Sequence, residues 1–114
     1  MRYDIDYFIS KFESIPSEHW STRSTVDGNK RDVLGHCGVT RLSWTDEADA
    51  FIDIVSQNMV DPVAATMIPL IINDGQAWAS GLGGTPKARI LTYLKALKRR
   101  NDVYKTKNVY SDAA

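Results

Sequence analysis

The sequence predicts a single, mainly α-helical domain, and three observations carry this prediction. The length of 114 residues is that of one ordinary domain and leaves no room for two independent cores. Apolar residues recur at spacings of three and four in three segments, and each segment follows a residue that caps helix N-termini. The apolar share of 43% and the charged share of 25% are ordinary for a folded globular chain. We therefore expect a compact domain with three main helices, one or two short helices and a glycine-rich loop.

The first predicted helix lies in the segment "DIDYFISKFESIP". Its apolar residues form one stripe with helical spacing: Ile5, Phe8, Ile9, Phe12 and Ile15. Asp4 is a good N-cap residue, and Pro16 disfavours the helical conformation of the residue before it. We expect a helix that begins after Asp4 and ends before Pro16.

Residues 16–38 predict a loop followed by a short helix. The stretch 16–31 is rich in Ser, Thr, Asp, Gly and Asn, which favour turns over helix, and Trp20 is its largest apolar side chain. In "RDVLGHCGV", Asp32 can cap a short helix and Gly38 can end it. We expect Trp20 to hold the loop against the core.

Residues 43–84 predict two further helices and a loop. "SWTDEADAFIDIVSQN" has Thr45 as its N-cap and acidic residues in its first turn, where the helix dipole favours negative charge. "DPVAATMIPLIIND" begins with Asp61 as cap and Pro62, but Pro69 predicts that this helix ends after about two turns and that "LIIN" is extended. The next segment, "DGQAWASGLGGT", holds four of the seven glycines and predicts a flexible loop.

The last predicted helix, in "TPKARILTYLKALKRR", has the strongest start signal. Thr85 is its N-cap and Pro86 takes the first helical position. We expect residues 1–100 to form the domain and residues 101–114 to form a C-terminal tail, because the latter hold few core residues. The expected core draws on all segments: Phe8, Phe12, Trp20, Leu34, Phe51, Ile52, Val55, Ile90, Leu91 and Leu94.

These segments, taken in order, also suggest a family. The succession of "DVLGHCGV", "IIND" and "TPKARILTYLKAL" resembles a small, functionally uncharacterised family of bacterial and bacteriophage helical domains, over roughly residues 4–98. The chain departs from the family pattern with Asp32, where many relatives have Cys, and with Ile72, where others have Trp. Because that family has no assigned activity, the resemblance implies a helical architecture and a possible phage origin but transfers no catalytic residue.

The charge balance and the composition argue against several classes of function. Fourteen basic and fourteen acidic residues cancel, so no overall field attracts nucleic acid or an anionic membrane. Residues 1–60 hold six basic and ten acidic residues, whereas residues 61–114 hold eight and four. The N-terminus lacks the apolar run of a signal peptide, and no stretch approaches roughly 18 apolar residues. We expect a cytosolic protein that does not enter the membrane.

The segment "LGHCG" places His36 beside Cys37, the only cysteine. Neighbouring helix residues point about 100° apart, so these two side chains would not face each other, although His19 could fold back toward the thiol. A free Cys is usually a small buried hydrophobe. We favour packing over chemistry here and keep a cysteine-dependent hydrolase or transferase, using Cys37 with His19 or His36, as the weakest alternative. The Cys and His spacings also match no known zinc pattern, so we expect no metal.

The candidate binding residues are Trp20, His36, Asn73 and Asp74. Asn73 and Asp74 could bond a polar ligand, or they could form a turn in which Gly75 takes a positive φ. The segments that hold these residues are irregular or rich in glycine, and their polar groups need partners once helices bury them. We expect them to converge, either as an open ligand site or as a closed structural cluster. "GLGGT" lacks the residue order of a nucleotide loop, so we expect no cofactor.

A second function is suggested by the basic end of the last predicted helix. Its cations are Lys95, Lys98, Arg99 and Arg100, followed by Lys105 and Lys107 with Tyr104 and Tyr110 between or after them. Lys and Arg contact phosphates and Tyr stacks on bases, but cations at a helix C-terminus are also favoured by the dipole alone. Our leading hypothesis is therefore a non-enzymatic domain that binds a protein or small molecule, with nucleic-acid binding as the alternative.

Overall fold

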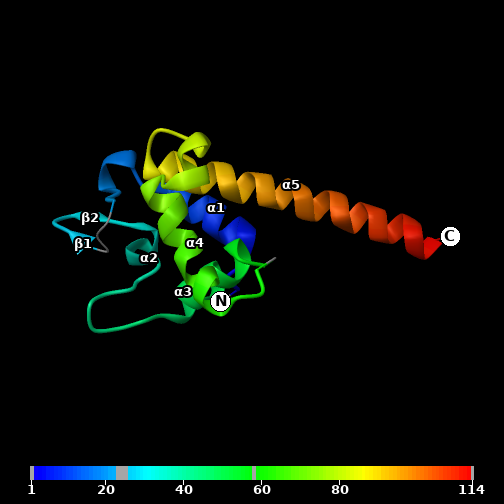
Figure 1. The fold of residues 1–114 in the computed structure, drawn as a ribbon, viewed down its shortest axis with the longest axis horizontal. Coiled ribbons are helices and arrows are strands. Elements are labelled where there is room, and N and C mark those ends of the chain that lie inside the picture. The colour runs from blue at the N-terminus through cyan, green and yellow to red at the C-terminus, as the bar shows by residue number, and fades with distance from the viewer. Residues whose placement is uncertain (1, 23–25, 58, 114) are drawn as a thin grey trace.

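The computed structural model describes residues 2–22, 26–57 and 59–113, and for Val26 and residues 105–113 it describes the backbone only. Helices α1, α3, α4 and α5 surround the core, and a small hairpin lies at one end (Figure 1). The elements follow in this order: α1 (Ile5–Ser14), η1 (Ser17–His19), β1 (Val26–Asp27), β2 (Lys30–Arg31), α2 (Val33–His36), α3 (Asp46–Val55), α4 (Pro62–Asp74), η2 (Ala77–Leu82) and α5 (Pro86–Ala113). The predicted mainly helical fold is confirmed.

The three main predicted helices are α1, α3 and α5, and local signals start each of them. The N-cap side chains accept hydrogen bonds from the third residue on: Asp4 from Tyr7 N at 2.9 Å, Thr45 from Ala48 N at 3.0 Å, and Thr85 from Ala88 N at 3.1 Å. These bonds satisfy backbone donors that have no partner inside the helix. The capping predictions are confirmed.

An aromatic cluster forms the centre of the core between α1 and α3. The rings of Phe8, Phe12 and Phe51 are fully buried, with centroids 5.2 to 5.7 Å apart. Trp20 meets Phe12 edge-on at 5.4 Å and so holds the segment after η1 against the core, as predicted. The other predicted core residues are buried too, except Leu91, which is only half-buried.

Helix α4 corrects the prediction that Pro69 ends a helix and leaves "LIIN" extended. The helix continues through Pro69 to Asp74. A proline inside a helix removes one backbone bond and costs about 3 kcal/mol. Here Ile68, Pro69 and Ile72 are all buried, and this packing against the core offsets that cost. Gly75 then ends the helix with φ 69°, the left-handed conformation that glycine adopts without strain.

Two predicted loops also contain regular structure. The hairpin pairs β1 with β2 around Gly28, which has a φ of 61° and so takes the positive value that glycine tolerates in tight hairpin turns. The glycine-rich segment after α4 holds the 3-10 helix η2, which packs against α4 and α5. Neither element has a long apolar period, so sequence periodicity alone does not reveal it.

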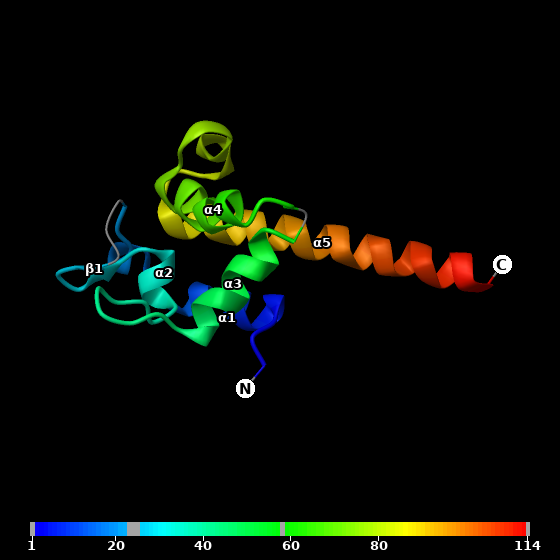
Figure 2. The same cartoon turned by 60° about the horizontal axis from the view of Figure 1, so that its bottom comes forward.

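Helix α5 crosses residue 100, where we expected a tail to begin. It continues to Ala113 and projects beyond the other elements (Figures 1 and 2). With this helix included, the longest dimension of the molecule is 56 Å. The sequence after Pro86 contains no glycine or proline up to Ala113, so it holds no strong stop signal. The division into a domain of residues 1–100 and a tail of residues 101–114 stays a prediction.

The burial of α5 predicts unequal effects for two leucines on the same helix. Leu94 is fully buried, whereas Leu91 is half-buried. We expect Leu94→Ala to lower the free energy of unfolding by about 2–5 kcal/mol through lost burial and a cavity. Leu91→Ala should cost clearly less. Urea denaturation of both variants checks this, and equal losses would contradict the burial pattern.

Candidate functional site

The structure brings the predicted binding residues Trp20, His36, Asn73 and Asp74 to the surroundings of α2, and we call these four residues the α2 cluster. The rings of Trp20 and His36 lie 4.4 Å apart between centroids. His36 Nε2 lies 3.0 Å from the backbone oxygen of His19. Asn73 contacts α2 through a hydrogen bond from Val33 N. The expected convergence of these segments is therefore present.

Asn73 closes this cluster rather than opening it to a ligand. Its side chain is fully buried, and its Oδ1 accepts a hydrogen bond from Val33 N at 2.9 Å. Its Nδ2 donates to Ser21 O and to Asp74 Oδ1, both at 2.9 Å. Both amide hydrogens are thus used, and no donor is left for a ligand. Asn73 joins α4 to α2 and to the segment after Trp20.

Arg89 satisfies the carboxyl end of α4 next to Asn73. Its guanidinium is almost fully buried and donates to Ile72 O at 3.0 Å, Asn73 O at 2.7 Å and Gly83 O at 3.1 Å. The first two are end carbonyls of α4, which have no partner inside the helix. A β-carbon at Gly75 would lie 2.8 Å from the Arg89 Cζ atom, so glycine is needed there for space as well as for its positive φ.

Burial sets the ionisation of the groups around α2. It lowers the pKa of His36, so the neutral imidazole is favoured. It raises the pKa of Asp32, helped by the negative charge of Asp74 and opposed by the hydrogen bond from Gly35 N. Among the described residues, the buried Nε1 of Trp20 finds no acceptor. Such an unsatisfied donor costs about 1–3 kcal/mol.

Cys37 belongs to a second polar cluster between α1 and α3, which sequence reasoning missed. Its buried thiol feels the negative charge of Glu47, whose carboxylate accepts hydrogen bonds from Tyr7 Oη at 2.6 Å and Lys11 Nζ at 2.5 Å. Burial, followed by the negative charge of Glu47, raises the pKa of Cys37 to about 12. Since the thiolate is the nucleophile, this environment disfavours thiol chemistry at neutral pH.

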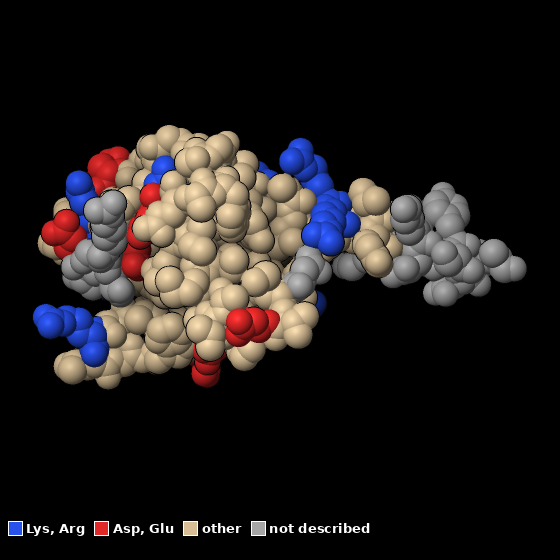
Figure 3. Space-filling view, viewed as in Figure 1, with Lys and Arg blue, Asp and Glu red and all other residues tan. Residues whose placement is uncertain are grey.

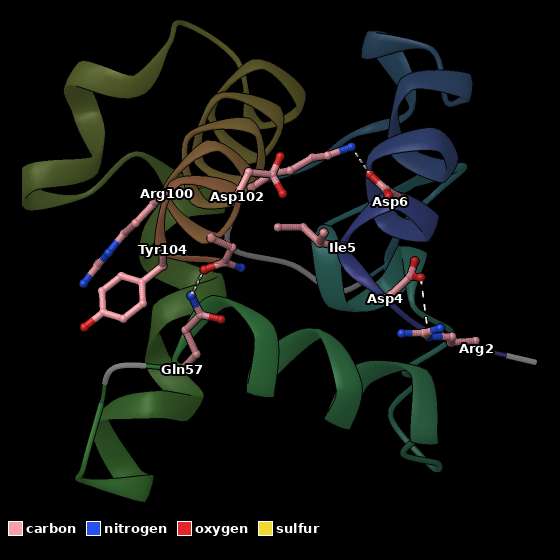
Figure 4. A pocket seen from close by; sticks show the side chains of 10 residues that line it. Arg2, Asp4, Ile5, Asp6, Gln57, Arg100, Asp102 and Tyr104 are labelled. Carbon is pink, nitrogen blue, oxygen red and sulfur yellow. Dashed lines mark hydrogen bonds and ion pairs between the residues drawn. The ribbon is translucent and has the colours of Figure 1, made fainter. Parts of the chain in front are cut away.

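A cleft of about 730 Å³ lies where α1 and α5 diverge (Figure 4). Its charged side chains largely pair with each other: Lys98 with Asp6, and Arg2 with Asp4 at 3.7 Å. Gln57 Nε2 donates to Asn101 Oδ1 at 3.0 Å across the same cleft. The cleft therefore offers mixed and mostly compensated charge.

Only some of the residues predicted to bind nucleic acid lie at this cleft. Lys98 and Arg100 line the cleft. Lys95 Nζ instead lies 3.9 Å from Glu13 Oε1, and Arg99 is exposed. Acidic neighbours of the two lysines reduce the positive field that phosphates would meet. The side chains of Lys105, Lys107 and Tyr110 lie outside the described residues.

An exposed apolar surface lies on the N-terminal half of α4. From Pro62 to Asn73 the helix carries no charged residue, and its apolar side chains lie on all sides. Two of them remain exposed, and so do two apolar residues just before the helix. We call these four residues the α4 face: Met59 (44%), Val60 (98%), Val63 (73%) and Met67 (48%). A broad uncharged surface covers this region in Figure 3.

Comparisons with protein-family models, curated proteins and solved structures find no significant match to this chain. The resemblance to a family of bacterial and bacteriophage domains therefore stays a prediction. Within the part of the chain that is described, no group of three or more His, Cys, Asp or Glu residues could hold a metal ion. No described helix combines the length and the apolar character needed to cross a membrane.

The α4 face could have been found from the sequence. Its signal is an uncharged run of twelve residues that begins at a strong helix start, because an apolar helix without a polar side needs cover on all sides. Interpreting Pro69 as the end of the helix hid this signal. The role of Arg89 has no comparable signal, since nothing local distinguishes it from the other cations of its helix.

The contact between Gly75 and Arg89 predicts different costs for two glycine substitutions. Gly28 and Gly75 have similar φ values of 61° and 69°, but only Gly75 has a neighbour within 4 Å of an added β-carbon. Both alanine variants lose about 1 kcal/mol or more to backbone strain. Gly75→Ala should lose more, because it also displaces Arg89 from three carbonyls. Thermal denaturation tests this, and equal losses would show that Arg89 moves freely.

The buried thiol predicts slow labelling of the native protein. With a pKa of about 12 against an ordinary 9.0, Cys37 should react with iodoacetamide at pH 8 at least about 1,000-fold more slowly than after denaturation. Cys37→Ala/Leu42→Cys is the control, because residue 42 is 98% exposed and its thiol should react quickly in the folded state. Rapid native labelling of Cys37 would revive the enzyme alternative.

Proposed function

We propose that this chain is a non-enzymatic protein-interaction domain whose contact surface is the α4 face. The observation that carries the proposal is a helix that is apolar on all sides but covered on only some of them. Contiguous exposed apolar side chains on a folded domain are typical of binding surfaces. Burying one such side chain fully contributes roughly 1.5–3 kcal/mol, so four of them can supply useful affinity.

A protein partner fits this surface better than a small molecule does. The α4 face projects from a helix and is not a cavity, whereas small ligands bind in concave sites. The cleft of about 730 Å³ lies elsewhere, between α1 and α5, and its lining is mostly polar. The α2 cluster, our first candidate, has its Asn73 amide fully engaged inside the fold. We therefore move the proposed contact from the α2 cluster to α4.

The two alternatives receive less support. For a cysteine enzyme, the nucleophile is buried, its pKa is raised, and His36 directs its Nε2 to the His19 backbone. For nucleic-acid binding, Lys95 and Lys98 have acidic neighbours, and acidic side chains share the cleft beside them. A cytosolic location and a phage origin are part of the proposal only as predictions from the sequence, and the proposal requires no cofactor.

Site-specific photo-crosslinking tests the proposed function. A benzophenone amino acid replaces Met67 on the α4 face, and in the control it replaces Leu42, an apolar residue that is 98% exposed outside this face. We expect a discrete adduct at position 67, but not at 42, when the protein is irradiated in the cells that encode it. Excess unlabelled wild-type protein should suppress the adduct, and a Val63→Asp variant should not. Equal adducts at both positions, or none, would contradict the proposal.

A further inference from the structure

The chain contains two Asp–Gly sequences, Asp27–Gly28 and Asp74–Gly75, and the fold places them in different surroundings. The first forms part of the hairpin of β1 and β2 at one end of the molecule (Figure 1). The second lies at the carboxyl end of α4. Asp–Gly is the sequence in which an aspartyl backbone rearranges most easily, because glycine has no side chain to shield its nitrogen. One dipeptide thus meets two different structural constraints.

The rearrangement needs only the chain and water. The glycine nitrogen attacks the side-chain carboxyl carbon, Cγ, of the preceding aspartate and closes a succinimide ring. The nitrogen gives up its proton and the carboxyl group gives up an oxygen, which together leave as one molecule of water. A second water then opens the ring. Its addition at Cγ restores aspartate, whereas its addition at the main-chain carbonyl carbon breaks the original peptide bond and leaves an isoaspartyl linkage with a free α-carboxylate.

The surroundings of Asp27 and Gly28 permit this ring closure. All four residues of 27–30 are exposed, and each strand of the hairpin has only two residues. Within the part of the chain that is described, Gly28 N donates no hydrogen bond, and a β-carbon added at Gly28 would have nothing within 4 Å. A hairpin of this size is only marginally stable by itself. The turn can therefore open locally at little cost and bring Gly28 N to the Asp27 Cγ atom.

The surroundings of Asp74 and Gly75 oppose the same step. Gly75 N already donates to Ile72 O at 3.3 Å in the cap of α4, so it is held away from the Asp74 carboxyl group. Asp74 Oδ1 accepts a hydrogen bond from the buried Asn73 side chain at 2.9 Å. The Arg89 guanidinium lies against Gly75 and is itself held by three carbonyls. Ring closure at Asp74 would require the buried end of α4 to open.

We infer that Asp27 is a modification site at which the native chain slowly forms an isoaspartyl linkage to Gly28, and that the fold protects Asp74 from the same reaction. The product carries an exposed α-carboxylate, which is the group that isoaspartyl carboxyl methyltransferases methylate. The extra backbone carbon shifts the register of β1 against β2. The end of β2 stays attached to the body, because Arg31 O accepts from Ser21 N at 2.9 Å. The change therefore stays within the turn.

Peptide mapping of the aged full chain tests the inference. The purified protein is incubated at physiological temperature and mildly acidic pH, and it is then digested with a protease that cuts before aspartate but not before isoaspartate. Methyl transfer from a labelled donor by an isoaspartyl methyltransferase locates the product independently. We expect the initial rate of isoaspartate formation to be at least about tenfold higher at position 27 than at position 74 in the native chain.

The same measurement in concentrated urea is the matched control. Both aspartates precede a glycine, so without the fold their rates should agree within about threefold. Asp27→Glu is the second control, because it keeps the negative charge but its longer side chain closes a larger and less favourable ring. It should abolish the product at position 27. Circular dichroism of the wild-type chain should be the same before and after incubation, since residues 27–30 are exposed and form no part of the core.

Each outcome decides for or against the inference. A native preference for position 27 that disappears in urea and that Asp27→Glu removes supports it. Equal rates at the two positions of the native chain, or no isoaspartate at position 27, overturn it. A preference that persists unchanged in urea overturns the role of the fold, because neighbouring sequence would then explain it. A helical spectrum that decays as the product accumulates would show that the change does not stay within the turn.

Discussion

The carboxyl end of α4 is buried, and the fold depends on how its polar groups are satisfied. Arg89 donates to the carbonyls of Ile72 and Asn73, and the Asn73 side chain bonds Val33 N and Ser21 O. A guanidinium is costly to desolvate unless acceptors replace its water, and here three carbonyls do so. One turn of chain thereby joins α2, α4, α5 and the segment after Trp20. Removing either side chain would leave buried groups unpaired, which costs more than an exposed hydrogen bond contributes.

The sequence predicted those parts of the fold that local chemistry decides. The side chains of Asp4, Thr45 and Thr85 each cap a helix by accepting a hydrogen bond from the backbone N–H three residues later. The apolar stripes of α1 and α3 face the core, as their spacing indicates. The sequence failed where distant packing decides. Pro69 is a strong local stop signal, but its own burial and that of its neighbours outweigh it. The extent of α5 was missed for the opposite reason, since residues 101–113 hold little core but also nothing that ends a helix.

The candidate site shows the same division. Because buried polar groups need hydrogen-bond partners, we correctly predicted that the segments holding Trp20, "LGHCG" and "IIND" converge. That need alone does not decide between an open and a closed cluster, because the answer depends on Ser21 and Val33, whose backbone groups take up the Asn73 amide. The α4 face was within reach of sequence reasoning once α4 is taken as one helix. The contacts of Glu47 in the polar cluster between α1 and α3 were not within reach. An acidic residue in the first turn of a helix is already explained by the helix dipole, so nothing in the sequence points to a further role.

The buried carboxyl end of α4 explains why the apolar side chains near its amino end stay exposed. Rotating the helix to bury Val63 and Met67 would turn Ile68 and Ile72 away from the core and would break the bonds of Asn73. The domain therefore keeps its exposed face because its carboxyl end is fixed, and the unrealised burial of the face remains available to association. The same polar bonds hold the face in one orientation before any partner arrives. A rigid surface loses little conformational entropy on binding, so even a modest apolar area there can favour a specific complex.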